Sequence, residues 1–96
     1  MNFLIELGVN KEIVDYLENT LSNQVIYAIN INEDNIKKNY RYLKQIGIRT
    51  VDDFLIRGLE ELFVDNKTFK DTINKFGKDD FIEKINDSSD YIDMVF

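Results

Sequence analysis

The chain holds no proline and only four glycines among its 96 residues. These two residue types interrupt helices most strongly, because proline lacks a backbone N–H and glycine loses the most backbone entropy on becoming helical. Between the glycines, apolar residues recur at intervals of three and four, which is the spacing of one buried helix face. The pattern therefore predicts an all-α fold of six to eight short helices, packed as stacked helical hairpins around one core.

Residues able to cap a helix N-terminus precede most of the apolar stripes. The candidates are Asn10, Asn32, Thr50, Asp65 or Asn66, Asp79, and Ser88 or Ser89. Thr50 is followed three residues later by Asp53, which predicts a variant of the capping box. At the opposite ends, Gly47 and Gly77 directly follow apolar stripes. We expect both to end helices, with Gly47 in the left-handed conformation that terminates a helix.

Residues 25–31 give a different signal. Val25, Tyr27, Ile29 and Ile31 alternate with their neighbours, which is the period of a strand rather than of a helix. A strand needs a partner, and no second segment of this kind is visible in the sequence. Two interpretations stay open, a short helix or an extended connector.

Three of the glycines stand in a matching sequence context. The segments that share it are 4–9, 43–48 and 73–77. In each, two apolar residues three positions apart are followed directly by glycine, and the first two segments also place an apolar residue after the glycine. This favours degenerate helical repeats that end in the same glycine joint. The alternative is that any small helical protein ends its helices in this way.

The length fits one domain spanning residues 1–96. The apolar fraction of 44% is well above the level of a disordered chain. The absence of cysteine excludes disulfides and thiolate chemistry. No apolar run approaches the roughly 18 residues of a membrane span, and the first residues lack the basic segment of a signal peptide. We therefore expect a cytoplasmic protein that does not enter a membrane.

Few side chains suited to catalysis are present, since the chain also has no histidine. Adjacent acidic pairs occur at 52–53, 60–61 and 79–80. They stand at predicted helix starts, where capping and the helix dipole explain them. Residues 30–41 resemble the start of a calcium-binding loop, but Asn35 replaces the required glycine and Arg41 replaces the bidentate glutamate. We therefore expect no enzymatic activity, no cofactor and no metal site.

Charge is distributed unevenly along the chain. The net charge of −6 disfavours a generic nucleic-acid binder. Residues 36–58 nevertheless hold six bases and two acids, whereas residues 1–35 hold six acids and one base. The candidate contacts to a partner or to phosphate are Lys37, Lys38, Arg41, Lys44 and Arg49. We call these five residues the basic segment.

The first four residues of the basic segment fall on the outer side of a predicted helix, away from its core positions. If nucleic acid binds, we expect it here, through phosphates and without base recognition. The competing interpretation is that acids from the flanking parts, such as Glu12, Asp15 or Glu60, neutralise this face within the fold.

Two families resemble the middle of the chain. Residues 35–76, NIKKNYRYLKQIGIRTVDDFLIRGLEELFVDNKTFKDTINKF, resemble one repeat of the mitochondrial transcription termination factor family. The matching positions are Leu43, Ile46, Gly47 and Ile48 at the first joint, Leu55, Leu59, Leu62 and Phe63 in the second helix, and Phe69, Ile73 and Phe76 in the next. The resemblance implies stacked helical repeats and, in the family, a basic concave surface that wraps nucleic acid.

The second resemblance is to the helix-hairpin-helix, as in the C-terminal domain of the RNA polymerase alpha subunit. The segments LKQIGIRTVDDFL and FGKDDFIEKI are similar to it. This resemblance implies phosphate contacts through the backbone amides of the hairpin turn.

These observations lead us to expect a non-enzymatic, small, acidic helical module that binds another macromolecule, with protein as the first choice of partner. One alternative is a nucleic-acid-binding helical-repeat or helix-hairpin-helix module that uses the basic segment. Another is an acidic decoy that inhibits a nucleic-acid-binding protein by occupying its site.

Overall fold

The computed structural model describes all 96 residues, and every element is helical. The α-helices are α1 (Asn2–Glu6), α2 (Lys11–Thr20), α3 (Asn23–Ile31), α4 (Glu33–Gln45), α5 (Val51–Arg57), α6 (Asn66–Phe76), α7 (Lys78–Asp87) and α8 (Ile92–Val95). Two 3₁₀ helices, η1 (Leu59–Phe63) and η2 (Ser89–Tyr91), complete the fold. The predicted all-α class is confirmed. None of the helices combines the length and the apolar character needed to cross a membrane.

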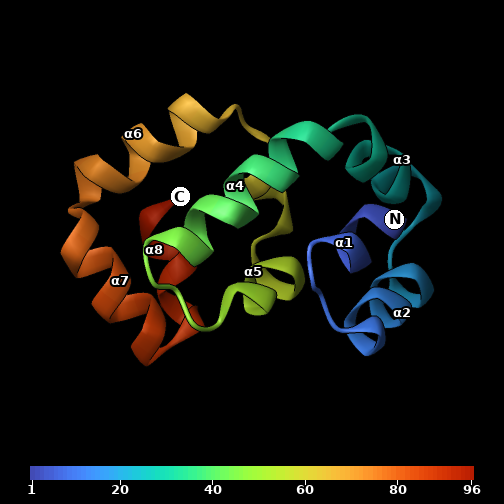
Figure 1. Ribbon diagram of the computed structural model, residues 1–96, viewed down its shortest axis with the longest axis horizontal. Helices are drawn as coiled ribbons and strands as arrows, with labels where there is room; N and C mark the ends of the chain where they lie inside the picture. Colours follow the sequence, from blue (N-terminus) through green and yellow to red (C-terminus); the bar gives the residue numbers. More distant parts are fainter.

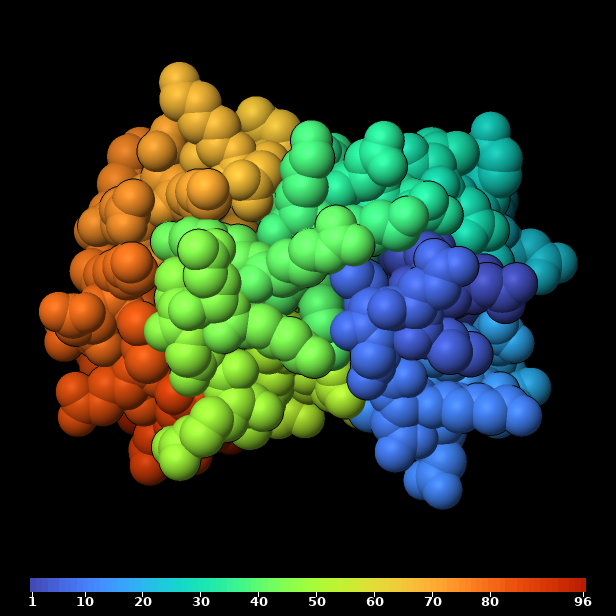
Figure 2. Space-filling model, in the orientation of Figure 1, coloured from blue at the N-terminus to red at the C-terminus, as the bar shows by residue number.

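Helix α4 lies in the middle of the molecule, with α1 to α3 at one end and α6 to α8 at the other (Figure 1). It packs against α1, α3, α5, α6 and η1. The buried side chains of α4 are Ile36, Asn39, Tyr40 and Leu43, which lie three and four residues apart and so share one face. The surface shows the same division, with the N-terminal and C-terminal parts at opposite ends of the middle segment (Figure 2). Twenty buried apolar residues form one continuous core.

Asn39 is the one fully buried polar side chain. Its Nδ2 donates to the carbonyl oxygens of Leu62 and Val64, at 3.0 and 2.8 Å, and its Oδ1 accepts from Asn66 Nδ2 at 3.0 Å. One turn earlier on α4, Asn35 Nδ2 donates to the Phe63 carbonyl at 2.9 Å. Three consecutive carbonyls at the end of η1 are thus satisfied by two amides of α4, because their own helix ends there and cannot supply donors. We call this arrangement the asparagine clasp.

Side-chain caps form at four helix starts. Asn10, Asp65 and Ser88 cap α2, α6 and η2 as predicted, each accepting a backbone N–H at 2.8, 3.3 and 3.2 Å. Ser22 caps α3 in the same way at 3.3 Å. All four have extended backbone conformations, from which a side chain reaches the free N–H groups of the first turn.

The predicted caps at Asn32, Thr50 and Asp79 are wrong. Asn32 precedes α4, but its Nδ2 donates back to the Ala28 carbonyl at 2.8 Å and so closes α3. Thr50 precedes α5 without a capping bond, so no capping box with Asp53 forms, and its Oγ1 is buried without a partner. Neither Asn32 nor Thr50 has the extended conformation of the working caps. Asp79 lies inside α7, which begins one residue earlier.

The ambiguous residues 25–31 belong to a helix, α3. Ile29 is fully buried and Val25, four residues earlier, is partly buried against the core. Tyr27 and Ile31 point to solvent instead. The apparent strand period arises because α3 carries apolar side chains on its exposed face as well as on its buried face.

Gly8 and Gly47 end α1 and α4 with the same left-handed geometry, at φ of +95° and +100°. In both, the residue after glycine donates its N–H to the carbonyl five positions earlier at 3.0 Å, which is the Schellman motif. Those following residues, Val9 and Ile48, are buried. Gly77 differs, because its own carbonyl already accepts the first hydrogen bond of α7. The predicted shared joint is therefore present at two of the three glycines.

Aromatic rings fill the C-terminal part of the core. Phe96 stacks on Phe69 with ring centroids 5.3 Å apart, and it meets Phe54 and Phe81 edge-on at 6.2 and 6.1 Å. Offset-stacked and edge-on arrangements are the favoured ones for aromatic pairs. This cluster joins α5, α6 and α7 around the end of the chain.

Replacing Asn39 by leucine, which has a similar volume, is expected to destabilise the protein by roughly 2–4 kcal/mol, because buried carbonyls and the Asn66 amide lose their partner. Urea unfolding measures this loss. The matched control is Asn74→Leu, on the exposed side of α6, which is expected to change stability by less than about 0.5 kcal/mol. Equal stability of Asn39→Leu and the parent would contradict the role of the clasp.

Candidate functional site

An open groove of about 460 Å³ lies where α2 and the start of α3 meet α5, η1 and α8. Leu17, Leu55 and Leu59 contribute buried apolar side chains to it. On its border stand Tyr16 and Ile56, which are 52% and 49% exposed. The groove therefore combines buried apolar side chains in its lining with large, half-exposed apolar side chains on its border.

The helices that carry Tyr16 and Ile56 use other residues to reach the core. On α2 the buried positions are Val14 and Leu17, and Tyr16 points away from the face that they share. On α5 the residue preceding Ile56, Leu55, is buried, so the next position turns outward. Neither Tyr16 nor Ile56 is needed to complete the core.

Gly58 brings η1 close to α8. A Cβ atom built on Gly58 would lie 2.8 Å from Ile92 Cγ2, which is closer than real Cβ contacts come. The absence of a side chain at this position therefore permits the packing. As a result Glu61, on η1, lies within the electrostatic influence of Asp93, on α8.

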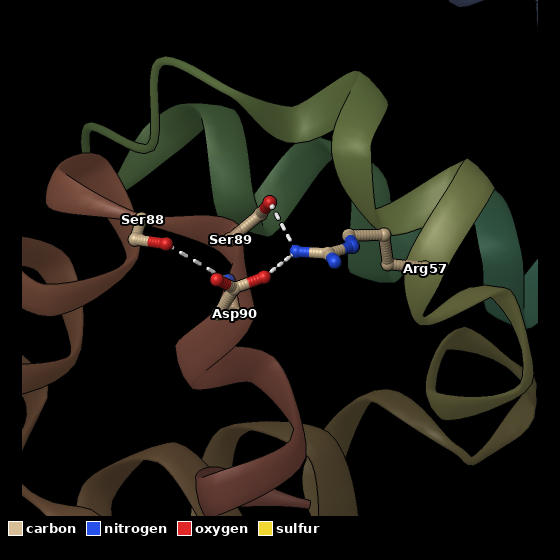
Figure 3. Close-up of polar contacts among 4 residues, drawn as sticks. All are labelled: Arg57, Ser88, Ser89 and Asp90. Carbon is tan, nitrogen blue, oxygen red and sulfur yellow. Dashed lines mark hydrogen bonds and ion pairs between the residues drawn. The ribbon is translucent and has the colours of Figure 1, made fainter.

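The groove has an acidic border. Partial burial, and then the negative charges of Glu60 and Asp93, raise the pKa of Glu61. The one cationic group on the border is Arg57, and its Nη1 donates to Asp90 and, at 3.2 Å, to Ser89 Oγ (Figure 3). The charge of Arg57 is thus directed towards η2, while the three carboxylates have no ion-pair partner.

The structure places four residues of the basic segment on α4. Lys38, Arg41 and Lys44 are exposed. Lys37 is partly buried, and its Nζ bonds Glu33 Oε2 at 2.9 Å. The predicted outer side of this helix is therefore where these cations lie.

The fifth residue, Arg49, follows the Gly47 joint and is separate from α4. Its backbone N–H donates to Asn86 Oδ1 at 2.8 Å, and it lines a shallow, mostly polar hollow that also contains Lys84, Asp87 and Tyr91. The hydrogen bond to Asn86 thus links the backbone of Arg49 to α7.

The expected direct pairing of the basic segment with distant acids does not form. The two ion pairs of the structure are Lys37–Glu33 and Arg57–Asp90. Lys44 instead places its Nζ 5.0 Å from the centroid of the Tyr40 ring, a cation–π distance. The one acid that pairs with the basic segment is therefore Glu33, four residues before Lys37 on the same helix, and Glu12, Asp15 and Glu60 form no ion pair with it.

One acid of the 52–53 pair has a structural role. The Tyr40 hydroxyl donates to Asp52 Oδ1 at 2.8 Å, which joins α4 to the start of α5. Burial, and then this hydrogen bond and the charge of Asp52, raise the pKa of Tyr40. The phenol therefore stays protonated and keeps the bond at all ordinary pH values.

Comparison with known proteins finds no match, whether among family models, curated proteins or solved structures. The two family resemblances of the middle segment accordingly remain predictions.

Sequence reasoning did not identify the groove. Its walls come from segments that are about forty residues apart in the chain, near Tyr16 and near Ile56. The available signal was that both side chains are apolar but lie off the helical stripe of their segment. Such residues are common on protein surfaces, so the signal becomes meaningful when the fold brings two of them to one hollow.

Glu61→Gln is expected to raise the melting temperature at pH 7. A carboxyl group whose folded pKa is raised favours folding while protonated and loses that contribution as pH rises through the raised pKa. The uncharged glutamine avoids this loss. The gain should shrink as pH falls towards the ordinary glutamate value of 4.5, where Glu61 itself becomes protonated.

Thermal melts at several pH values test this expectation. Glu12→Gln, at an exposed position in the first turn of α2, serves as the control and should give no gain. A Glu61→Gln variant that melts no higher than the parent at pH 7 would contradict the account of the acidic border.

Proposed function

We propose that this chain is a non-catalytic module that binds a segment of another protein in the groove between α2, α3, α5, η1 and α8. The observation that carries the proposal is the pair of half-exposed side chains, Tyr16 and Ile56, beside a hollow to which Leu17, Leu55 and Leu59 contribute buried side chains. Aromatic and aliphatic side chains that line such a hollow are the usual anchors of protein recognition.

The dimensions of the groove support a peptide segment as the occupant. Its volume of about 460 Å³ lies within the usual range for binding pockets, about 300–1,000 Å³. It is open to solvent, and residues of helices form most of its walls. An amphipathic segment that lays a few apolar side chains into a groove between helices is a common recognition mode.

The composition supports a non-catalytic role. The chain lacks both histidine and cysteine, which supply most general bases and nucleophiles. The phenol–carboxylate pair of Tyr40 and Asp52 holds two helices together and faces the core side of α4. Its geometry serves packing.

Ile56→Asn is expected to abolish capture of the partner, because an amide in place of the sec-butyl group of isoleucine weakens the apolar contact without adding charge. Ile5→Asn is the matched control, since Ile5 on α1 is exposed to the same degree, 47% against 49%, and lies outside the groove. Quantitative mass spectrometry of proteins retained from a lysate of the source cells measures the difference, with circular dichroism confirming that both variants fold.

Retention of the same protein by the parent and by Ile5→Asn, and its loss with Ile56→Asn, is the expected result. Equal retention by both variants, or equal loss, would place the binding surface elsewhere and contradict the proposal.

Nucleic acid is the second candidate, favoured by the exposure of Lys38 and Arg41 on the outer side of α4 without ion-pair partners. The net charge of −6 opposes it, and we expect no binding of labelled single- or double-stranded oligonucleotides at low salt. Fluorescence anisotropy tests this. Binding that weakens steeply with salt and is lost in a Lys38→Glu, Arg41→Glu double variant would place nucleic acid first.

A further inference from the structure

Three carboxylates border the groove without a cation bound to any of them. Glu60 and Glu61 come from η1, and Asp93 comes from α8. They take part in neither of the two ion pairs of the structure. Arg57, the one cation of the border, is bonded to Asp90 on the neighbouring 3₁₀ helix (Figure 3).

These carboxylates act on one another. Partial burial disfavours ionisation of Glu61 and so raises its pKa, and the negative charges of Glu60 and Asp93 add to the effect. Gly58, which directly precedes η1, allows the close approach of Ile92, the residue before Asp93. A cation that enters the groove would offset the repulsion between these carboxylates. No cation of the chain pairs with them, so binding of a cationic partner would gain this favourable interaction.

The apolar lining complements a long cationic side chain. Lysine and arginine carry aliphatic stems that pack on apolar surface while the charged end stays near water. Here the stem could lie against Leu59 and Val25, with the charged end among the carboxylates. Tyr16 offers a ring on the same border, and cations bind favourably over aromatic faces.

We propose that the groove is selective for a cationic amphipathic segment of another protein, which places a lysine or arginine side chain among Glu60, Glu61 and Asp93 and apolar side chains against the leucines beneath. This inference deepens the proposed function and rests on it, since it assumes that the groove is the binding site. Beyond the proposed function, it specifies that the partner segment is cationic and names the carboxylates that recognise its charge.

A random peptide library displayed against the intact protein tests the selectivity. We expect the recovered peptides to be enriched in lysine and arginine together with aliphatic residues. A recovered peptide is then titrated against a Glu61→Gln, Asp93→Asn variant. Its affinity should fall about fivefold or more, as expected for the loss of two partly exposed charge contacts.

Two further variants make the result specific. Asp79→Asn, Glu83→Gln removes two exposed carboxylates from α7 and so matches the change in net charge, and affinity for the peptide should stay unchanged. Ile56→Asn tests whether a peptide binds in the groove, and it should lower the affinity of every recovered peptide. The Glu61→Gln, Asp93→Asn variant is expected to stay folded, because it removes repulsion between carboxylates.

The outcomes separate the two levels of the proposal. Peptides that depend on Ile56 but show no basic enrichment, or bind the Glu61→Gln, Asp93→Asn variant normally, would overturn the charge selectivity and leave the proposed function standing. Equal weakening by the two charge variants would reduce the effect to net charge and also overturn it. Peptides whose affinity is unchanged by Ile56→Asn, or failure to recover any binding peptide, would overturn both the charge selectivity and the proposed function.

Sedimentation of the protein alone tests whether a second copy of this chain occupies the groove. Self-association that is lost in the Glu61→Gln, Asp93→Asn variant would identify the cationic segment as part of a second copy, and would overturn the proposal of a separate partner. A monomer at all concentrations is the expected result.

Discussion

The asparagine clasp is the interaction on which the arrangement of the helices depends. A 3₁₀ helix that ends inside a protein leaves carbonyl groups without partners, and each unsatisfied buried carbonyl carries a substantial cost. Asn35 and Asn39 supply donors to three successive carbonyls, those of residues 62 to 64, in one buried and two partly buried hydrogen bonds. Because both amides belong to α4, the bonds fix this central helix relative to η1 and to the start of α6. The apolar core packs around the same helices, so the hydrogen bonds and the core support one arrangement.

The shape of the groove depends on the position of η1, which the asparagine clasp fixes relative to α4. The end of η1 is held by the clasp, and its beginning is held against α8 by the contact that Gly58 permits. Between these two points Glu61 has little freedom to move away from Asp93. The repulsion between the carboxylates therefore persists in the folded protein, where a flexible loop would have relaxed it. The site is acidic because Glu60, Glu61 and Asp93 meet at its border.

Much of the fold could be predicted from the sequence, because local signals and packing agree. Gly47 follows an apolar stripe and takes the left-handed conformation that only glycine adopts easily. The caps at Asn32 and Thr50 failed because residue type does not determine backbone conformation. The groove could not be predicted, since Tyr16 and Ile56 become neighbours only through tertiary packing. The outer-side positions of Lys37, Lys38, Arg41 and Lys44 on α4 were predictable from helical spacing, whereas the position of Arg49 beside α7 depends on tertiary packing.

The groove takes one wall from the first quarter of the chain and the other from its second half. Neither wall forms a hollow alone, so the groove exists only while α2 remains docked against α5. An occupant would consequently act as a clamp on the docking of the N-terminal helices, slowing amide hydrogen exchange in α2 and α3 well beyond the residues it touches. Opening of these helices and release of the partner would then be one and the same motion.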